Sequence, residues 1–215
     1  MKGSEKMSES SLWTIDHDYR GEEYATFENA WLLPPIALDI LFEKYLPEEA
    51  VSEYGKKQYL IALWRDRNLF SRLNNKVNES PVQTDRVLWE FCHSQIFFAK
   101  DKNFIACSLR EFLQENAGFT KEFVTDLFER FQEVANEISQ LDETMYPYFV
   151  FKNTSVDDNV AFWFRYFDDE QQVYCSRTLR DVDCPVSEFV LIENDKIIGF
   201  VSNKEFFQKQ DDLTK

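Results

Sequence analysis

Apolar residues recur at helical spacing in the first two-thirds of the chain and at alternate positions in the last third. The most regular pattern lies at 120–142, where apolar side chains stand three or four residues apart. This spacing places them on one face of a helix. Gly118 suits the end of the preceding helix and Thr120 the start of this one. The apolar positions of this predicted helix are Phe123, Leu127, Phe131, Val134, Ile138 and Leu141.

Prolines divide the preceding region into further predicted helices. Pro35 and Pro47 suit a first helical turn, where the missing backbone N–H costs no hydrogen bond. Residues 12–30 are acidic and aromatic without a clear period, and we expect an arm laid on the body. The predicted segments are a disordered lead over 1–11, helices over 35–46 and 47–73, a loop over 74–80, and a helical region from Pro81 that breaks near 101–103.

After Pro147 the period becomes two, which predicts strands. The chain therefore reads as α+β, with a helical N-terminal two-thirds (12–147) packed against a C-terminal antiparallel sheet (148–215) of about five strands. We expect the two regions to fold as one cooperative unit. The predicted strands are 148–152, 160–167, 172–178, 189–193 and 196–201, with turns at 168–170 and 194–195 and a final short helix over 203–209.

The net charge of the chain indicates what kind of partner it binds. The chain has 39 acidic and 24 basic residues, a net charge of −15. That charge opposes nonspecific binding to nucleic acid or anionic lipid and favours a basic partner. Segment 54–78 is the exception, with six cations against Asp66 alone. Its interleaved aromatics resemble a single-strand nucleic-acid surface, but we favour core packing and internal ion pairs, because the net charge of the molecule would repel a nucleic acid.

Five acids of the predicted helix 120–142 fall in one row. They are Glu122, Asp126, Glu129, Glu133 and Glu137, at spacings of four, three, four and four. Like charges at these spacings destabilise a helix, so we expect either a solvated face or a docking face for a basic groove. The row spans about 22 Å at 1.5 Å per residue. Asp157, Asp158, Asp168, Asp169 and Glu170, in predicted loops, form a second acidic patch.

Few residues suggest catalysis. The five glycines are scattered, which excludes the clustered glycines of phosphate-binding loops. Arg86 and His93 lie seven apart, and this spacing resembles the Arg-x(4–6)-His motif of HEPN-type ribonucleases. That resemblance implies action on an RNA phosphodiester, but Val87 stands where the family usually has a polar residue. Glu90 and His93 form one Glu-x-x-His pair, whereas di-iron bundles need two, so we predict no metal and no cofactor.

Four cysteines without short paired spacing predict a reduced, cytoplasmic protein. The polar start of the chain shows no signal peptide, and the apolar stretch 31–42 is too short to span a bilayer. We therefore expect a non-enzymatic acidic protein that inhibits a basic, nucleic-acid-handling protein, as an immunity protein, antitoxin or phage inhibitor does. The alternatives are a HEPN-like ribonuclease using Arg86 and His93, and a scaffold subunit with an apolar patch at Trp13, Tyr19, Tyr24 and Phe27.

Overall fold

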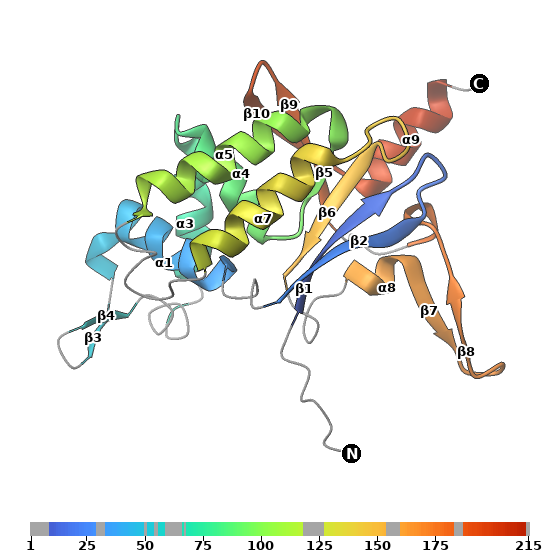
Figure 1. The fold of residues 1–215 in the computed structure, drawn as a ribbon, viewed down its shortest axis with the longest axis horizontal. Coiled ribbons are helices and arrows are strands. Elements are labelled where there is room, and N and C mark those ends of the chain that lie inside the picture. Colours follow the sequence, from blue (N-terminus) through green and yellow to red (C-terminus); the bar gives the residue numbers. More distant parts are fainter. Residues whose placement is uncertain are drawn as a thin grey trace.

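The fold is built on a six-stranded mixed sheet with helices on both faces (Figure 1). It is seen in a computed structural model, which describes residues 9–28, 33–49, 51–53, 56–58, 66, 68–117, 127–153, 160–182 and 187–213. The strand order is β10-β9-β5-β6-β1-β2. All neighbouring strands pair antiparallel except β5 and β9, which are parallel.

The strands of this sheet come from all parts of the chain. They are β1 (Glu9–Ile15), β2 (Gly21–Glu28), β5 (Ile96–Phe98), β6 (Tyr148–Lys152), β9 (Glu188–Glu193) and β10 (Lys196–Ser202). Two separate hairpins pair β3 (Val51–Glu53) with β4 (Lys56–Gln58), and β7 (Arg165–Asp168) with β8 (Val173–Ser176).

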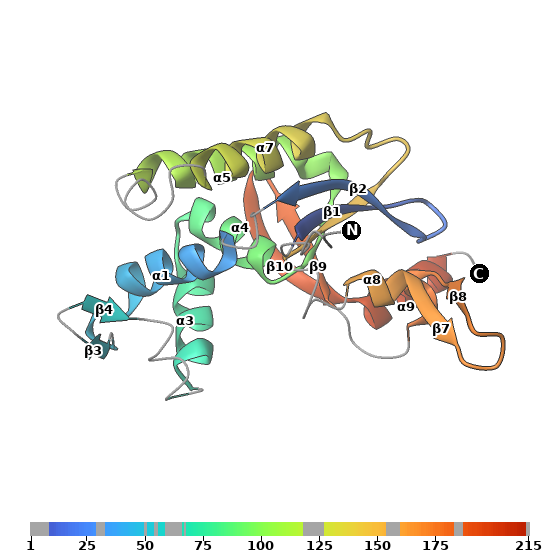
Figure 2. The ribbon, with the colours of Figure 1, turned by 60° about the horizontal axis from the view of Figure 1, so that its bottom comes forward.

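Helices cover the sheet on two sides (Figure 2). One side carries α1 (Leu33–Tyr45), α3 (Asn68–Glu79), α4 (Gln83–Cys92), α5 (Lys102–Glu115) and α7 (Leu127–Gln140). The other carries α8 (Val160–Phe164) and α9 (Asn203–Leu213). Short 3-10 turns lie at Pro47–Glu49 (η2), Ala99–Asp101 (η3) and Leu179–Asp181 (η4). Among the described residues, no helix is long and apolar enough to cross a membrane.

The predicted layout of a helical N-terminal two-thirds against a C-terminal antiparallel sheet is wrong. Strands β1, β2 and β5 come from the supposed helical part, and helices α8 and α9 come from the supposed β region. Strand β1 shows no alternation of apolar and polar residues, because it is buried on both faces of the sheet. In β2 the pairing register shifts at Tyr24, which interrupts the alternation that would have indicated a strand.

The predicted helix over 47–73 is also wrong, because η2, β3 and β4 occupy its first half. Helix α3 begins only at Asn68 and runs through the predicted loop 74–80. It buries Leu69, Leu73 and Val77, spaced by four. Similarly, the first part of the predicted strand 160–167 is α8, which buries Val160, Trp163 and Phe164 at helical spacing.

Other predicted elements are confirmed. Helix α7 lies within the predicted 120–142, and β6 has the predicted bounds. Strands β8, β9 and β10 agree to within one or two residues at each end, and α9 extends the predicted 203–209.

Two apolar cores lie on the two faces of the sheet. The larger joins the sheet to α1, α3, α4, α5 and α7, and Phe91 stacks on Phe151 in it with ring centroids 4.6 Å apart. The smaller joins the sheet to α8, η4 and α9, and there Phe189 stacks on Phe206 at 4.1 Å. Because both cores contain sheet residues, the strands of the N-terminal and C-terminal regions belong to one packed body.

Candidate protein-interaction surface

Helix α7 presents its acids on the side opposite its core residues. Glu129 and Glu133 are exposed and Glu137 is half-buried. Residues four apart on a helix share a face, so these three form a row of about 12 Å at 1.5 Å per residue. Arg130 Nη1 lies 2.9 Å from Glu133 Oε2, so one member of the row has a basic neighbour. Glu122 and Asp126, the other two predicted members, lie outside the described residues.

Strand β2 adds one acid, Glu22, on the α7 side of the sheet. It is an edge strand of the sheet and contacts α7. Its Glu22, Glu23 and Glu28 are exposed. Tyr146, just beyond α7, donates a hydrogen bond to Glu22, and this bond raises the pKa of the tyrosine. Sequence reasoning missed these glutamates because 12–30 showed no period. Charged side chains on an edge strand would have been a usable signal, since they keep such edges from pairing with other chains.

The turn between β7 and β8 holds the second acidic patch. Asp168 Oδ1 accepts hydrogen bonds from the backbone N–H groups of Glu170, at 2.9 Å, and Gln171, at 3.0 Å. Its carboxylate therefore builds the turn. Asp169 and Glu170 are exposed at the tip. Asp157 and Asp158 lie outside the described residues.

The basic segment 54–78 contacts other acids. Arg72 Nη1 lies 2.6 Å from Glu49 Oε1. Within the described part of the chain, no ion pair joins this segment to the acids of α7. Arg72 and Lys76 are the cations of this segment whose side chains the structure describes, and neither forms an ion pair with the α7 row.

Arg86 and His93, both positioned by α4, point to different elements. Arg86 Nη1 donates to the carbonyl of Ile197 at 3.0 Å, so it faces β10. His93 Nδ1 donates to the Trp89 carbonyl at 2.6 Å, and its ring packs against those of Trp89 and Phe70. Burial lowers the pKa of His93, and the bond to Trp89 acts in the opposite direction. The structure does not bring the two side chains together around one reacting atom.

Glu90 lies between them on α4 and is 3% exposed. Burial raises the pKa of its carboxyl group to about 7, although Gln95 and Asn78 donate hydrogen bonds to it and Arg86 is near. Its Oε1 atom has no hydrogen-bond partner. Within the described ranges, no group of three or more His, Cys, Asp or Glu side chains is arranged to hold a metal ion.

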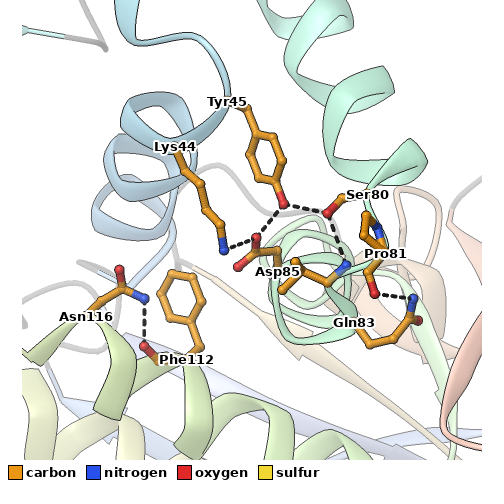
Figure 3. Close-up of polar contacts among 9 residues, drawn as sticks. Lys44, Tyr45, Ser80, Pro81, Gln83, Asp85, Phe112 and Asn116 are labelled. Atoms are coloured by element: carbon orange, nitrogen blue, oxygen red, sulfur yellow. Dashed lines mark hydrogen bonds and ion pairs between the residues drawn. The ribbon is translucent and has the colours of Figure 1, made fainter.

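A polar cluster joins the end of α1 to the start of α4 (Figure 3). Asp85 is fully buried. Its Oδ2 atom lies 2.6 Å from Lys44 Nζ and 2.5 Å from the Tyr45 hydroxyl. Ser80 Oγ lies 2.7 Å from the same hydroxyl and accepts the backbone N–H of Val82 at 3.1 Å. The cluster links α1, the loop between α3 and α4, and the start of α4.

The chemistry of this cluster favours a structural role. Burial and the bond to Asp85 raise the pKa of Tyr45, whereas a catalytic tyrosine base needs a lowered pKa. Beside the cluster lies an open hollow of about 380 Å³, lined by Ile40, Glu43, Lys44, Glu115 and Asn116.

The fold divides the apolar patch that was predicted for a scaffold subunit. Trp13 and Phe27 are buried in the cores, and Tyr24 is exposed.

No protein-family model, no curated protein and no solved structure matches this chain.

Proposed function

We propose that this protein is a non-enzymatic acidic binding protein that docks on a basic, nucleic-acid-handling protein and occludes its binding surface. The observation that carries the proposal is the position of the α7 row, Glu129, Glu133 and Glu137, alongside the acidic edge strand β2. Two elements of the same body carry these acids, and Glu22, which accepts a hydrogen bond from Tyr146 just beyond α7, adds a carboxylate on the same side of the sheet.

Such a surface matches the needs of electrostatic recognition. A net charge of −15 attracts a cationic protein over long range, and clustered charges then select its orientation. A backbone held by a helix and a sheet needs no ordering on binding, so the entropy cost is limited to the side chains themselves. A groove lined with lysine and arginine for phosphates is the partner surface that such carboxylates fit. Immunity proteins, antitoxins and phage inhibitors of nucleic-acid enzymes act in this way, in the cytoplasm.

The test compares two triple variants with the same loss of charge. The first, Glu129→Gln, Glu133→Gln and Glu137→Gln, removes the α7 row, and the second, Glu188→Gln, Glu193→Gln and Glu205→Gln, removes exposed acids of β9 and α9. Each changes the net charge from −15 to −12. Immobilised wild type and variants are incubated with lysate of the native host at low and high salt. The retained proteins are identified, and their nucleic-acid binding is measured with and without wild-type protein.

We expect wild type and the second variant to retain a basic nucleic-acid-handling protein that high salt releases, and the first variant to lose it. The retained protein should also lose its nucleic-acid binding when wild type is added. Equal retention by both variants would refute a role for the α7 row. A neutral partner that survives high salt would refute the charge mechanism and support a scaffold.

A further inference from the structure

Exposed apolar side chains gather on one part of the molecule. Of the nine large apolar side chains exposed among the described residues, five lie between 162 and 174. The most exposed are Tyr174, at 68%, and Phe162, at 55%. Large exposed apolar patches mark interaction sites on most proteins. The five are Phe162, Tyr166, Phe167, Val173 and Tyr174.

These residues lie on and beside a hairpin that has no other strand to pair with. Strands β7 and β8 pair only with each other in the described structure, and the hairpin projects away from the main sheet in both views (Figures 1 and 2). Each strand therefore has an outer edge of backbone groups outside any ladder. A two-stranded hairpin is marginally stable by itself, and a third strand adds the missing stability.

Both faces of the hairpin carry apolar groups. Phe167 stands opposite Tyr174, with ring centroids 5.1 Å apart. Tyr166 and Val173 occupy the other face, since neighbouring residues of a strand point to opposite sides. A strand added at the β7 edge would thus lie beside Phe167 on one face and Tyr166 on the other, and one added at the β8 edge beside Tyr174 and Val173.

The acidic residues of the β7–β8 turn favour an added strand that carries positive charge. Asp169 and Glu170 are exposed there, while Asp168 is held by the turn. Carboxylates at the tip attract lysine and arginine and repel phosphate, so a basic peptide fits better than a nucleic acid. A second copy of this chain fits less well, because each copy brings its own acidic tip and a net charge of −15.

We propose that the β7–β8 hairpin binds an extended segment of a basic protein, in which apolar residues alternate with lysine or arginine, as an added strand. The proposal rests on the proposed function in one respect, the basic character of the partner. It assigns the apolar anchor to a different part of the surface from the α7 row. The two can therefore fail separately.

The probe is a labelled synthetic peptide of alternating leucine and lysine, and fluorescence anisotropy with the full-length protein measures its affinity. A peptide of alternating leucine and serine tests the charge requirement. The leucine–lysine peptide with alternate backbone nitrogens methylated tests strand addition, because it cannot complete the ladder. This last peptide leaves the protein unchanged, so its result does not depend on whether a protein variant folds.

Protein variants locate the site. Phe167→Ser with Tyr174→Ser removes the aromatic pair, and Ile198→Ser removes an exposed apolar side chain of β10 as a matched control. Asp169→Asn with Glu170→Gln removes the tip charges and keeps Asp168, which builds the turn. The triple α7 variant serves as the control that separates this site from the acidic row.

We expect the aromatic variant to bind the leucine–lysine peptide about tenfold more weakly or worse, as losses at interface anchors do. The tip variant should bind severalfold more weakly, and the Ile198 and α7 variants should bind as wild type does. Neither the leucine–serine peptide nor the methylated peptide should bind well. This result would support the hairpin site even if no basic partner were retained from lysate.

Three results would overturn the proposal. They are equal binding by the aromatic variant and wild type, equal binding of the methylated and unmethylated peptides, and equal affinity for the leucine–serine peptide. Sedimentation of the protein alone is the fourth measurement. Self-association that the aromatic variant abolishes would assign the hairpin to a second copy and overturn the choice of a basic segment.

Discussion

Replacement of Glu90 by glutamine is expected to stabilise the protein at alkaline pH. Glu90 is 3% exposed, and burial raises the pKa of its carboxyl group from the usual 4.5 to about 7. A group that holds its proton more tightly when folded stabilises the fold at low pH. That stability is complete below pH 4.5 and is lost as the pH rises through about 7, because folding must then bury a charge.

The magnitude follows from the two pKa values of Glu90. At about 1.4 kcal/mol per pKa unit, the change from 4.5 to about 7 corresponds to about 3 kcal/mol at pH 8 and to less than about 1 kcal/mol at pH 5. Glutamine keeps the shape of the side chain and an oxygen that accepts from Gln95 and Asn78. Its amide takes the place of Oε1, which has no partner in the wild type, so the exchange breaks no hydrogen bond there. The pKa of about 7 already includes the attraction to Arg86, so the expected gain at pH 8 stays at about 3 kcal/mol.

Urea denaturation of wild type and Glu90→Gln at pH 5 and pH 8 measures this effect. Comparison of the two proteins at each pH cancels the titration of the other acids. Glu193→Gln is the control, because Glu193 is exposed on β9 and should change stability little at either pH. Equal differences between Glu90→Gln and wild type at pH 5 and pH 8 would contradict the reasoning. So would a variant that is less stable than wild type at pH 8.

Two further substitutions test the packing and the polar cluster. Gly21→Ala should lower the free energy of unfolding by about 1–3 kcal/mol, because a Cβ atom there would lie 2.5 Å from the buried ring of Phe164. Gly199→Ala is the control and should have little effect, since a Cβ atom at Gly199 meets nothing within 4 Å. Thermal denaturation compares the two variants with wild type. Tyr45→Phe should lower the free energy of unfolding by about 1–3 kcal/mol, because it removes the hydrogen bond from the tyrosine hydroxyl to buried Asp85. Urea denaturation measures this change. An unchanged midpoint would show that the cluster does not stabilise the junction of α1 and α4.

The acidic surface shows how much of the site was predictable. The spacing of Glu129, Glu133 and Glu137 within an amphipathic pattern was enough to place them on the outer face of α7. The position of α7 beside β2 was not predictable, because the two elements are far apart in sequence and only the sheet order places β2 there. The ion pair between Arg130 and Glu133 also depends on side-chain direction, which spacing alone does not specify.

Arg86 illustrates the same limit. Arg86 and His93 lie seven residues apart, so they could share one face of a helix. In the structure, however, Arg86 contacts β10 and His93 contacts α3. Contacts with neighbouring elements decide where long side chains end, and these contacts exist only after the chain has packed.

Local chemistry by itself determined α7, whose period one apolar face sets, and it placed β6, β9, β10 and the start of α9 in the region after Pro147. It also determined the surplus of negative charge. Tertiary structure alone decided that β1, β2 and β5 belong to the same sheet as β9 and β10, and that α8 is a helix. The physical reason is that a strand buried on both faces, or bent by a bulge, has no alternation to read. Its conformation is selected by partners that are distant in sequence.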